Sequence, residues 1–118
     1  MNKLKEKNNK FGNKEKLLNL LGLATKARKT SIGSDTALKM ISSKKAFVVF
    51  VAKDASNATI EKFNNKCFYY NILIDLSLDS VELSQAVGRN NAKVLTVNDQ
   101  GFATSIKNIL KDGVKYEG

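Results

Sequence analysis

The stretch Gly33–Lys39 holds the residue types best suited to bind a nucleic acid. Apolar residues that recur three and four positions apart behind its glycine predict the start of an amphipathic helix. Ser34 would cap this helix with its side-chain oxygen, and Asp35 suits the positive end of the helix dipole. Free backbone N–H groups, small polar side chains and Lys39 one turn further on are typical of a site for a phosphate or a base edge. The alternative is a solvated helix start in which Asp35 pairs with Lys39.

A second stretch, Gly88–Lys93, carries the same residue types. Gly88 follows a helical pattern and is expected to end that helix in the left-handed conformation. The run Arg89–Lys93 predicts an exposed polar loop. Lys and Arg hold phosphates together with backbone amides, while small polar side chains reach base edges, so the two stretches could converge on one RNA. Because no paired aromatic residues suggest the stacking of single-stranded bases, we expect a structured RNA with an irregular feature.

Residues that run enzymatic reactions are scarce in this chain. Histidine is absent, which removes the commonest general base and the commonest metal ligand. Asp54 and Asp99 each follow a predicted strand, where α/β enzymes place catalytic groups, but both precede a helix, and capping or turn formation explains them better. Cys67 is the only cysteine, so an internal disulfide and a cysteine-based metal site are excluded. We expect Cys67 itself to be a small residue of the core. We therefore expect no catalytic residue, no metal, no cofactor and no small-molecule substrate.

The composition favours a basic cytoplasmic protein that meets a polyanion. The 118 residues suffice for one domain and carry a net charge of +9. Residues 1–16 contribute +4 and the remainder +5, so the excess is not confined to one end. Nucleic acid is the commonest partner of such a protein, and an anionic membrane surface is the weaker alternative because no long basic amphipathic helix is visible. No apolar run is long enough to span a membrane, and no secretory signal follows the basic N-terminus.

The elements that must position the two stretches alternate between helix and strand. Residues 14–113 are expected to form a single domain, and residues 114–118 a frayed end. Residues 1–13 are expected to form a disordered basic tail, which is either an electrostatic arm on RNA or a solubilising segment. Apolar periodicity and capping residues predict helices over 14–29, 34–43, 57–68, 80–87 and 100–112. Asn13 is the expected cap of the first helix and Gly22 a close-packing point within it. Ser56 is the expected cap of the helix at 57–68, and Asp79 with Glu82 resembles a capping box at the start of the helix at 80–87. Short apolar runs predict these strands: 30–32 at an edge, 46–52 and 72–74 buried, and 94–97. The spacing indicates an α/β fold with a small, mostly parallel or mixed sheet and helices on both faces.

Four runs of residues in a fixed order carry a resemblance to a known family. The runs are Gly33–Ile41, Lys45–Ser56, Glu82–Gly88 and Asn98–Ala103. Together they resemble the kink-turn-binding ribosomal protein superfamily of the L-seven-Ae and L-thirty-e types, and most of all its small bacterial YlxQ-type members. The resemblance covers about residues 17–110. It implies a three-layer α/β/α sandwich with a four-stranded mixed sheet, and binding to kinked RNA helices that contain tandem sheared G·A pairs.

The resemblance also implies which residues bind RNA. In the family motif Gly-x-Asn-Glu-x-x-Lys, Gly33 and Lys39 match, whereas Asp35 stands at the Asn position and Thr36 at the Glu position. The family's second RNA segment falls on Arg89–Lys93. Its apolar shelf for an extruded base falls near Ser56 and Ile60. The expected RNA-binding residues are Lys29, Gly33, Ser34, Asp35, Thr36, Lys39, Arg89, Asn90, Asn91 and Lys93.

The sequence thus predicts a monomeric, cytoplasmic, non-enzymatic protein that binds structured RNA such as ribosomal RNA or another kink-turn RNA, with the ribosome as a further partner. Two alternatives remain open. One is an accessory module related to the substrate-binding domain of RNA methyltransferases. The other is a protein-interaction adaptor that docks through the helix around Leu17–Leu23.

Overall fold

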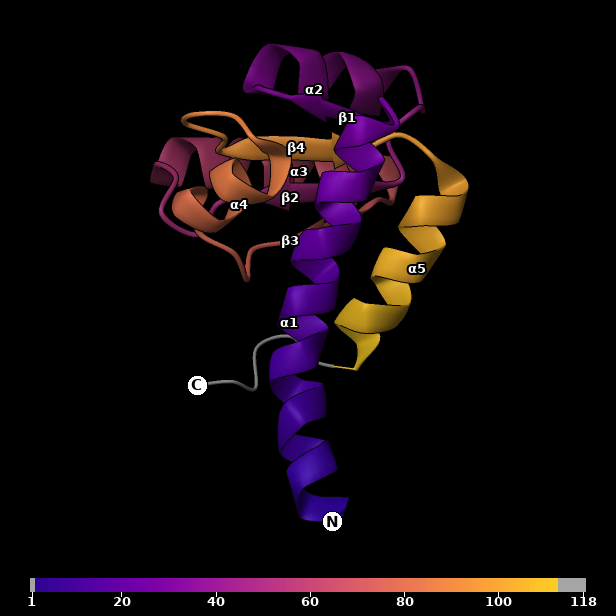
Figure 1. Cartoon of the computed structure of the whole chain (residues 1–118). Coiled ribbons are helices and arrows are strands. Elements are labelled where there is room, and N and C mark those ends of the chain that lie inside the picture. The colour runs from indigo at the N-terminus through magenta and orange to yellow at the C-terminus, as the bar shows by residue number, and fades with distance from the viewer. Residues whose placement is uncertain (1, 113–118) are drawn as a thin grey trace.

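The computed structural model describes residues 2–112, with side chains from Gly12 onward. Five helices and four strands follow one another along this part of the chain (Figure 1). In order they are α1 (Asn2–Lys26), β1 (Thr30–Ile32), α2 (Ser34–Ser42), β2 (Val48–Val51), α3 (Asn57–Tyr70), β3 (Leu73–Asp75), α4 (Ser80–Val87), β4 (Val94–Val97) and α5 (Gln100–Lys111). Each predicted helix and strand is present, with shifts of a few residues at most ends and a larger shift at the start of α1.

The four strands form one mixed sheet in the order β1-β4-β2-β3. β4 is antiparallel to both β1 and β2, and β2 is parallel to β3. Every residue of β2 and β4 is buried, because these two strands lie in the middle of the sheet and are covered on both faces. The α/β fold with a small mixed sheet is therefore confirmed.

Helices cover both faces of this sheet. α1 contacts α4 and α5, and Figure 1 shows these three helices in front of the sheet. α3 lies behind it and contacts β2 and β3, while α2 contacts α3, β1 and β4. The arrangement gives the three layers that the family resemblance implied.

The strand predicted over residues 72–74 is not buried in the centre. β3 occupies the edge beside β2, and 44% of the surface of Leu73 is exposed. A run of three apolar residues looks the same in the middle of a sheet and at its edge, and only the pairing with other strands decides between the two positions. The prediction of a strand was right, and the prediction of full burial was wrong.

The first helix begins earlier and ends sooner than predicted. Its backbone runs from Asn2, so the predicted cap Asn13 lies inside it. The upstream Lys, Glu and Leu residues are good helix formers and let the helix continue past that position. The helix ends at Lys26, where Arg28 adopts a left-handed φ of 62°. The role predicted for residues 1–13 stays a prediction, and the frayed end at 114–118 lies outside the described residues.

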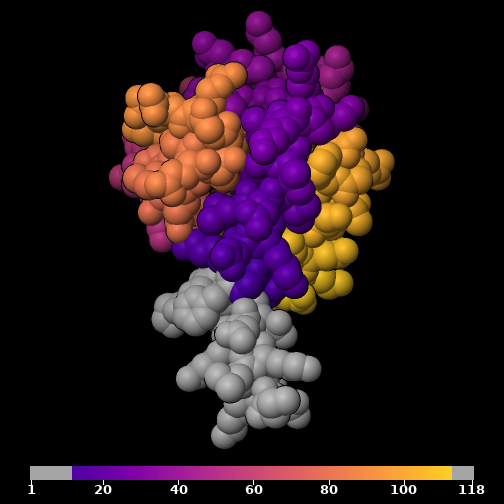
Figure 2. Space-filling model, in the orientation of Figure 1, coloured from indigo at the N-terminus to yellow at the C-terminus, as the bar shows by residue number. Residues whose placement is uncertain are grey.

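Helices α1 and α4 touch closely at Gly22. In the space-filling view α1 runs between α4 and α5 (Figure 2). A Cβ atom placed on Gly22 would lie 2.9 Å from the carbonyl oxygen of Ala86, closer than real Cβ contacts come. The close-packing role predicted for this glycine is therefore confirmed, and it is the absence of a side chain that lets the two backbones approach.

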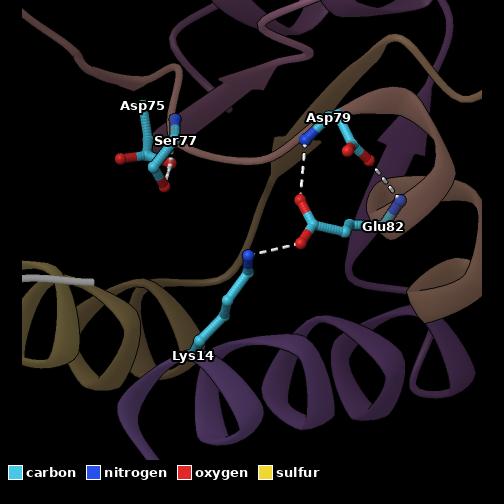
Figure 3. A network of polar contacts seen from close by, with 5 residues as sticks. All are labelled: Lys14, Asp75, Ser77, Asp79 and Glu82. Carbon is cyan, nitrogen blue, oxygen red and sulfur yellow. Dashed lines mark hydrogen bonds and ion pairs between the residues drawn. The ribbon is translucent and has the colours of Figure 1, made fainter. Parts of the chain in front are cut away.

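The start of α4 is fixed to α1 by a small polar network (Figure 3). Asp79 and Glu82 form a reciprocal capping box, in which the backbone N–H of each donates to the side chain of the other at 2.8–2.9 Å. Lys14 of α1 forms an ion pair with the same Glu82 carboxylate. The predicted capping box is present, and Asp serves in the position where Ser or Thr is usual.

Replacing Gly22 with alanine is expected to destabilise the fold even though alanine is the better helix former. The improvement in helix propensity is about 1 kcal/mol, whereas overpacking against a backbone carbonyl costs about 1–3 kcal/mol. Gly12 offers the matched control, since it lies in the same helix and a Cβ atom placed on it would have nothing within 4 Å. Chemical denaturation should show Gly22→Ala less stable and Gly12→Ala no less stable than the parent. Two changes of the same sign would contradict the close contact.

Candidate nucleic-acid interface

The two polar stretches singled out in the sequence meet at one end of the sheet. β1 and β4 pair with Ile32 opposite Leu95, and just beyond this pair the Gly33 N–H donates to the carbonyl oxygen of Val94 at 2.9 Å. Val94 directly follows Lys93, so the start of α2 and the end of the loop lie side by side. We call the surface formed by Gly33–Lys39 and Gly88–Lys93 the polar edge.

The end of β2 belongs to the same region. Val51 is paired with Val94, and the Ala52 N–H donates to the carbonyl oxygen of Lys93 at 2.8 Å. Ser56, four residues further on, caps α3 by accepting a hydrogen bond from the N–H of Thr59 at 3.1 Å, as predicted. The two residues expected to form the apolar shelf thus lie at the cap and in the first turn of α3, beside the polar edge, with Ser56 exposed and Ile60 half-buried.

The cap of α2 differs from the prediction. Gly33, not Ser34, occupies the cap position, and no side chain caps the helix. Gly33 has φ 106° and ψ 152°, a conformation open essentially to glycine alone. Ser34 is the first helical residue, so its oxygen is too far along the helix to act as the cap. The amides of residues 34–36 therefore receive no capping side chain, and they are donors available to an external acceptor.

The loop from Gly88 to Lys93 is held in one shape from beneath. Gly88 ends α4 with φ 69°, as predicted, and Asn91 also has a left-handed φ of 57°. Ser84 ties the loop down twice, because its carbonyl oxygen accepts from the Arg89 N–H at 3.0 Å and its Oγ accepts from the Ala92 N–H at 2.9 Å. Ala92 is fully buried, whereas the other four loop side chains are exposed: Arg89, Asn90, Asn91 and Lys93.

Replacing Ser84 with alanine is expected to loosen this loop. The amide of the buried Ala92 would lose its acceptor, which costs about 1–3 kcal/mol. Ser42, an exposed serine at the end of α2, is the control, and Ser42→Ala should change stability by no more than about 0.5 kcal/mol. Hydrogen exchange should show the Ala92 amide exchanging faster in Ser84→Ala. Unchanged protection of this amide would show that Ser84 does not anchor the loop.

Asp54 joins the polar edge to α4 rather than serving as a catalytic group. Its two carboxylate oxygens accept from the backbone N–H of Ser80 at 2.8 Å and from the Ser80 hydroxyl at 2.6 Å. These hydrogen bonds from Ser80, aided by the nearby charge of Lys93, keep the pKa of Asp54 below its ordinary value. The bonded, ionised carboxylate stabilises the fold at neutral pH, and this contribution is lost as the pH falls through the lowered pKa. Asp99 is also structural, since it caps α5 through the N–H of Phe102 at 2.9 Å.

The positive charges of the polar edge are available to a ligand. Lys39, Arg89 and Lys93 are exposed, and over residues 12–112 the one ion pair present is that of Lys14 with Glu82. The pair of Asp35 with Lys39, which was the alternative explanation of this helix start, is therefore not formed. Asp35 is the one carboxylate among the residues of the polar edge, so the edge carries a net positive charge and can attract phosphates.

Lys53 is a cation at this edge that the sequence patterns did not bring out. It is exposed, and its backbone N–H donates to the carbonyl oxygen of Leu78 at 2.9 Å. It comes two residues after β2, whose end lies beside the start of β4. Its position directly after the apolar run 46–52 was the feature of the sequence that could have identified it.

Lys29, by contrast, is not at the polar edge. It precedes β1, and its carbonyl oxygen accepts from the Asn98 N–H at 2.7 Å, beyond the far end of β4. The three residues of β1 lie between it and Gly33, and the four steps along the extended chain span about 13 Å. The structure brings the other nine predicted RNA-binding residues to one end of the sheet and leaves Lys29 at the opposite end.

Other kinds of site find no support in the described part of the chain. Across residues 12–112 no three His, Cys, Asp or Glu side chains gather in a way that could hold a metal ion. Within the described helices, none is both long enough and apolar enough to cross a membrane. Cys67 is buried, as predicted, and burial raises the pKa of its thiol to about 11, so the thiol stays protonated at neutral pH.

Comparison with known proteins identifies relatives of the whole region that holds this edge. Residues 15–107 match the model of the ribosomal protein L7Ae/L30e/S12e/Gadd45 family. The chain is 36% identical over 100 residues to the RNA-binding protein YlxQ of Enterococcus faecium, with 85% of this chain and 96% of the relative covered. It is also 36% identical over 91 residues to the RNA-binding protein YlxQ of Bacillus subtilis (strain 168), with 77% and 91% covered.

Solved structures agree with this assignment. A Bacillus halodurans protein of unknown function superposes with a TM-score of 0.78 at 29% identity, covering 81% of this chain and 97% of that one. The 15.5kD RNA binding protein of Giardia lamblia superposes with a TM-score of 0.72 at 19% identity, covering 81% and 82%, and supports the fold alone. The shared fold and the matching sequence over most of its length show that this chain belongs to the ribosomal protein L7Ae/L30e/S12e/Gadd45 family.

Proposed function

We propose that this protein binds structured RNA through the polar edge and that its preferred target is a kinked RNA helix, in ribosomal RNA or in another kink-turn RNA. Two relatives at 36% identity are named RNA-binding proteins, and both are matched over more than nine tenths of their length. Their names and the family bear out the prediction of a binding protein rather than an enzyme. We further propose that it acts in the cytoplasm as a monomer, with the ribosome as a partner.

The observation that carries the proposal is the hydrogen bond from Gly33 to Val94. It brings the uncapped amides of α2 beside the loop that exposes Arg89 and Lys93. A phosphate or base acceptor at the helix start would receive the amide N–H donors, while the cations hold phosphates on either side. Gly33 carries no side chain, so the RNA backbone can come close to the protein backbone at this point.

Base recognition would come from the short polar side chains around this anchor. Asp35 and Thr36 are exposed on the first turn of α2, and Asn90 and Asn91 are exposed on the loop. Hydroxyl, amide and carboxylate groups bond to base edges, whereas lysines carry no sequence information when they contact phosphates. Ile60 beside the cap of α3 offers partly exposed apolar surface for a base that leaves the helix.

A binding experiment with two RNAs tests the proposal. A kink-turn RNA and a straight duplex of equal length are titrated with the protein at several salt concentrations. With about four to six phosphate contacts, the plot of log affinity against log salt should have a slope of about −3 to −5, and the kink-turn should bind more tightly throughout. Equal affinity for both RNAs at every salt concentration would leave only non-specific charge attraction and would refute recognition of the kink.

The adaptor hypothesis receives less support from the structure. It required the leucines of α1 to face a protein partner, but Leu17 and Leu21 are fully buried in the core, and Leu18 and Leu20 pack against it. Leu23 is the exception, with 54% of its surface exposed. The apolar face of α1 therefore serves mainly to cover the sheet and its neighbouring helices.

A further inference from the structure

The outer face of α3 carries a stripe of residues that the proposed function does not use. Lys62, Asn65, Lys66 and Tyr69 follow one another at positions i, i+3, i+4 and i+7, so they lie along one side of the helix. All four are exposed, and together they line a surface hollow of about 420 Å³. We call these four residues the α3 stripe.

The charge of the α3 stripe is unbalanced. Lys62 and Lys66 are one helical turn apart and repel each other, and no carboxylate lines the hollow between them. Neither lysine forms an ion pair within residues 12–112. Two like charges kept side by side without a counter-charge suit an anionic ligand, and the spacing of one turn matches successive anionic groups rather than one.

Tyr69 adds an aromatic surface to this charge. Its side chain is 79% exposed, which is unusual for a ring of this size. Its ring makes an edge contact with the ring of Tyr70, with centroids 4.9 Å apart and planes at 79°. Tyr70 packs against the core, so this contact restrains the exposed ring before any ligand arrives.

We propose that the α3 stripe is a second RNA contact, which binds a single-stranded segment leaving the structured RNA at the polar edge. Lys62 and Lys66 hold phosphates of this segment, one base stacks on Tyr69, and the Asn65 amide bonds to the base or sugar. Cations beside an aromatic ring are the combination that proteins use for single strands. This inference rests on the proposed function, because the structured RNA is what delivers the segment to the stripe.

Continuity with the polar edge favours RNA over an acidic protein as the occupant. α3 begins at its cap Ser56 beside that edge and reaches Tyr69 thirteen residues later, a distance of about 20 Å along the helix axis. At about 3.4 Å for each nucleotide of one strand, some six nucleotides span this distance. An unpaired segment of this length, anchored at the polar edge, would therefore reach the stripe.

The test compares a kink-turn RNA with the same RNA extended by about six unpaired adenosines, added at either end in two separate RNAs. The parent protein should bind one of the extended RNAs at least about 5-fold more tightly than the unextended RNA. Tyr69→Ala should abolish most of this increase in affinity, and Tyr69→Phe should keep it, since a phenyl ring stacks as well. Thermal melts of both variants check that they fold. Because the Tyr69 side chain is largely exposed, neither substitution should lower the melting temperature much.

Two double variants distinguish phosphate binding by the stripe lysines from attraction of RNA by the net charge of the protein. Lys62→Gln with Lys66→Gln should reduce the increase in affinity and lower the magnitude of the salt slope for the extended RNA by about 1.4. The control is Lys107→Gln with Lys111→Gln, two exposed lysines of α5 at the same spacing, which should keep the increase. If both pairs lose it equally, net charge alone explains the effect and the stripe proposal is wrong.

The outcomes distinguish the two proposals. If the unextended kink-turn binds no better than a straight duplex, the proposed function fails, and the stripe proposal falls with it. If the unextended kink-turn is preferred but neither extension increases affinity, or if Tyr69→Ala keeps the whole increase, only the stripe proposal is overturned.

Discussion

Replacing Gly33 with alanine is expected to lower the free energy of unfolding by about 1–3 kcal/mol, because the residue would have to keep a backbone conformation that side chains disfavour. The glycine has φ 106° and ψ 152°, and its N–H is bonded to Val94 at 2.9 Å. No atom lies within 4 Å of a Cβ built there, so the cost is conformational and not a clash. If the backbone relaxes instead, the bond to β4 weakens and the polar edge opens. RNA affinity should then fall by more than the loss of folded protein explains.

Gly88 provides the comparison for Gly33. It also has a positive φ, but its values of 69° and 33° lie in the left-handed helical region that asparagine tolerates. Gly88→Asn should therefore cost little, and Gly33→Asn should cost about as much as Gly33→Ala. Urea denaturation of the three variants measures the stabilities, and RNA titration well below the melting temperatures measures binding. A Gly33→Ala protein as stable as the parent would show that α2 does not need this conformation at its start.

Exchanging Asp35 for asparagine and Thr36 for glutamate should sharpen the recognition of sheared G·A pairs. An ionised aspartate only accepts hydrogen bonds and places a negative charge near phosphates, whereas asparagine both donates and accepts. Threonine is shorter than glutamate and reaches less far toward a guanine edge. By analogy with base readout in DNA, one additional bidentate hydrogen-bonded pair is worth about 1–3 kcal/mol of discrimination. The double variant should therefore bind a kink-turn better relative to a mutant RNA whose G·A pairs are disrupted.

Lys39→Ala is the matched test of the other half of the motif. Lys39 is exposed and forms no ion pair within residues 12–112, so its expected role is to hold a phosphate. Its loss should weaken the intact and the disrupted RNA by a similar factor, because a phosphate contact carries no sequence information. If the double variant leaves the ratio of the two affinities unchanged while Lys39→Ala alters it, the roles assigned to these residues are reversed.

Local signals in the sequence were sufficient for most of the fold. The capping box at Asp79, the cap at Ser56 and the left-handed Gly88 each follow from chemistry within a few residues, and each is present. The strand at 94–97 is predicted with its bounds, because an apolar β-prone run flanked by polar residues has few alternatives. The meeting of the two polar stretches was a hypothesis, and the pairing of β1 with β4 is what brings them together.

The errors arose where a distant contact decides the outcome. Ser34 is a good capping residue, but the bond of Gly33 to β4 places the glycine at the cap position. β3 is apolar enough for a central strand, and it lies at the edge because β2 is the one strand of this sheet that pairs with it. Lys29 lies at the other end of β1 from Gly33, and the predicted strand 30–32 between the two residues already indicated this separation.

The α3 stripe escaped prediction for a different reason. Apolar periodicity identifies the buried face of a helix, and on α3 it points to Phe63 and Cys67, both of which are buried. The opposite face has the composition of ordinary solvated surface. That Tyr69 stands out of this face, with a lysine one turn before it, becomes visible only when the exposed fraction of each side chain is known.

Backbone amide shifts measured by NMR during an RNA titration test most directly whether the polar edge is where RNA binds. The titration uses isotopically labelled protein and an unextended kink-turn RNA. We predict the largest changes for the amides of residues 34–36, which have no capping side chain, and for the loop residues from Arg89 to Lys93. Smaller changes are expected around Ser56, and little change at Lys107 on α5. Large shifts confined to α1 and α5, with residues 34–36 and the loop unaffected, would contradict binding at the polar edge.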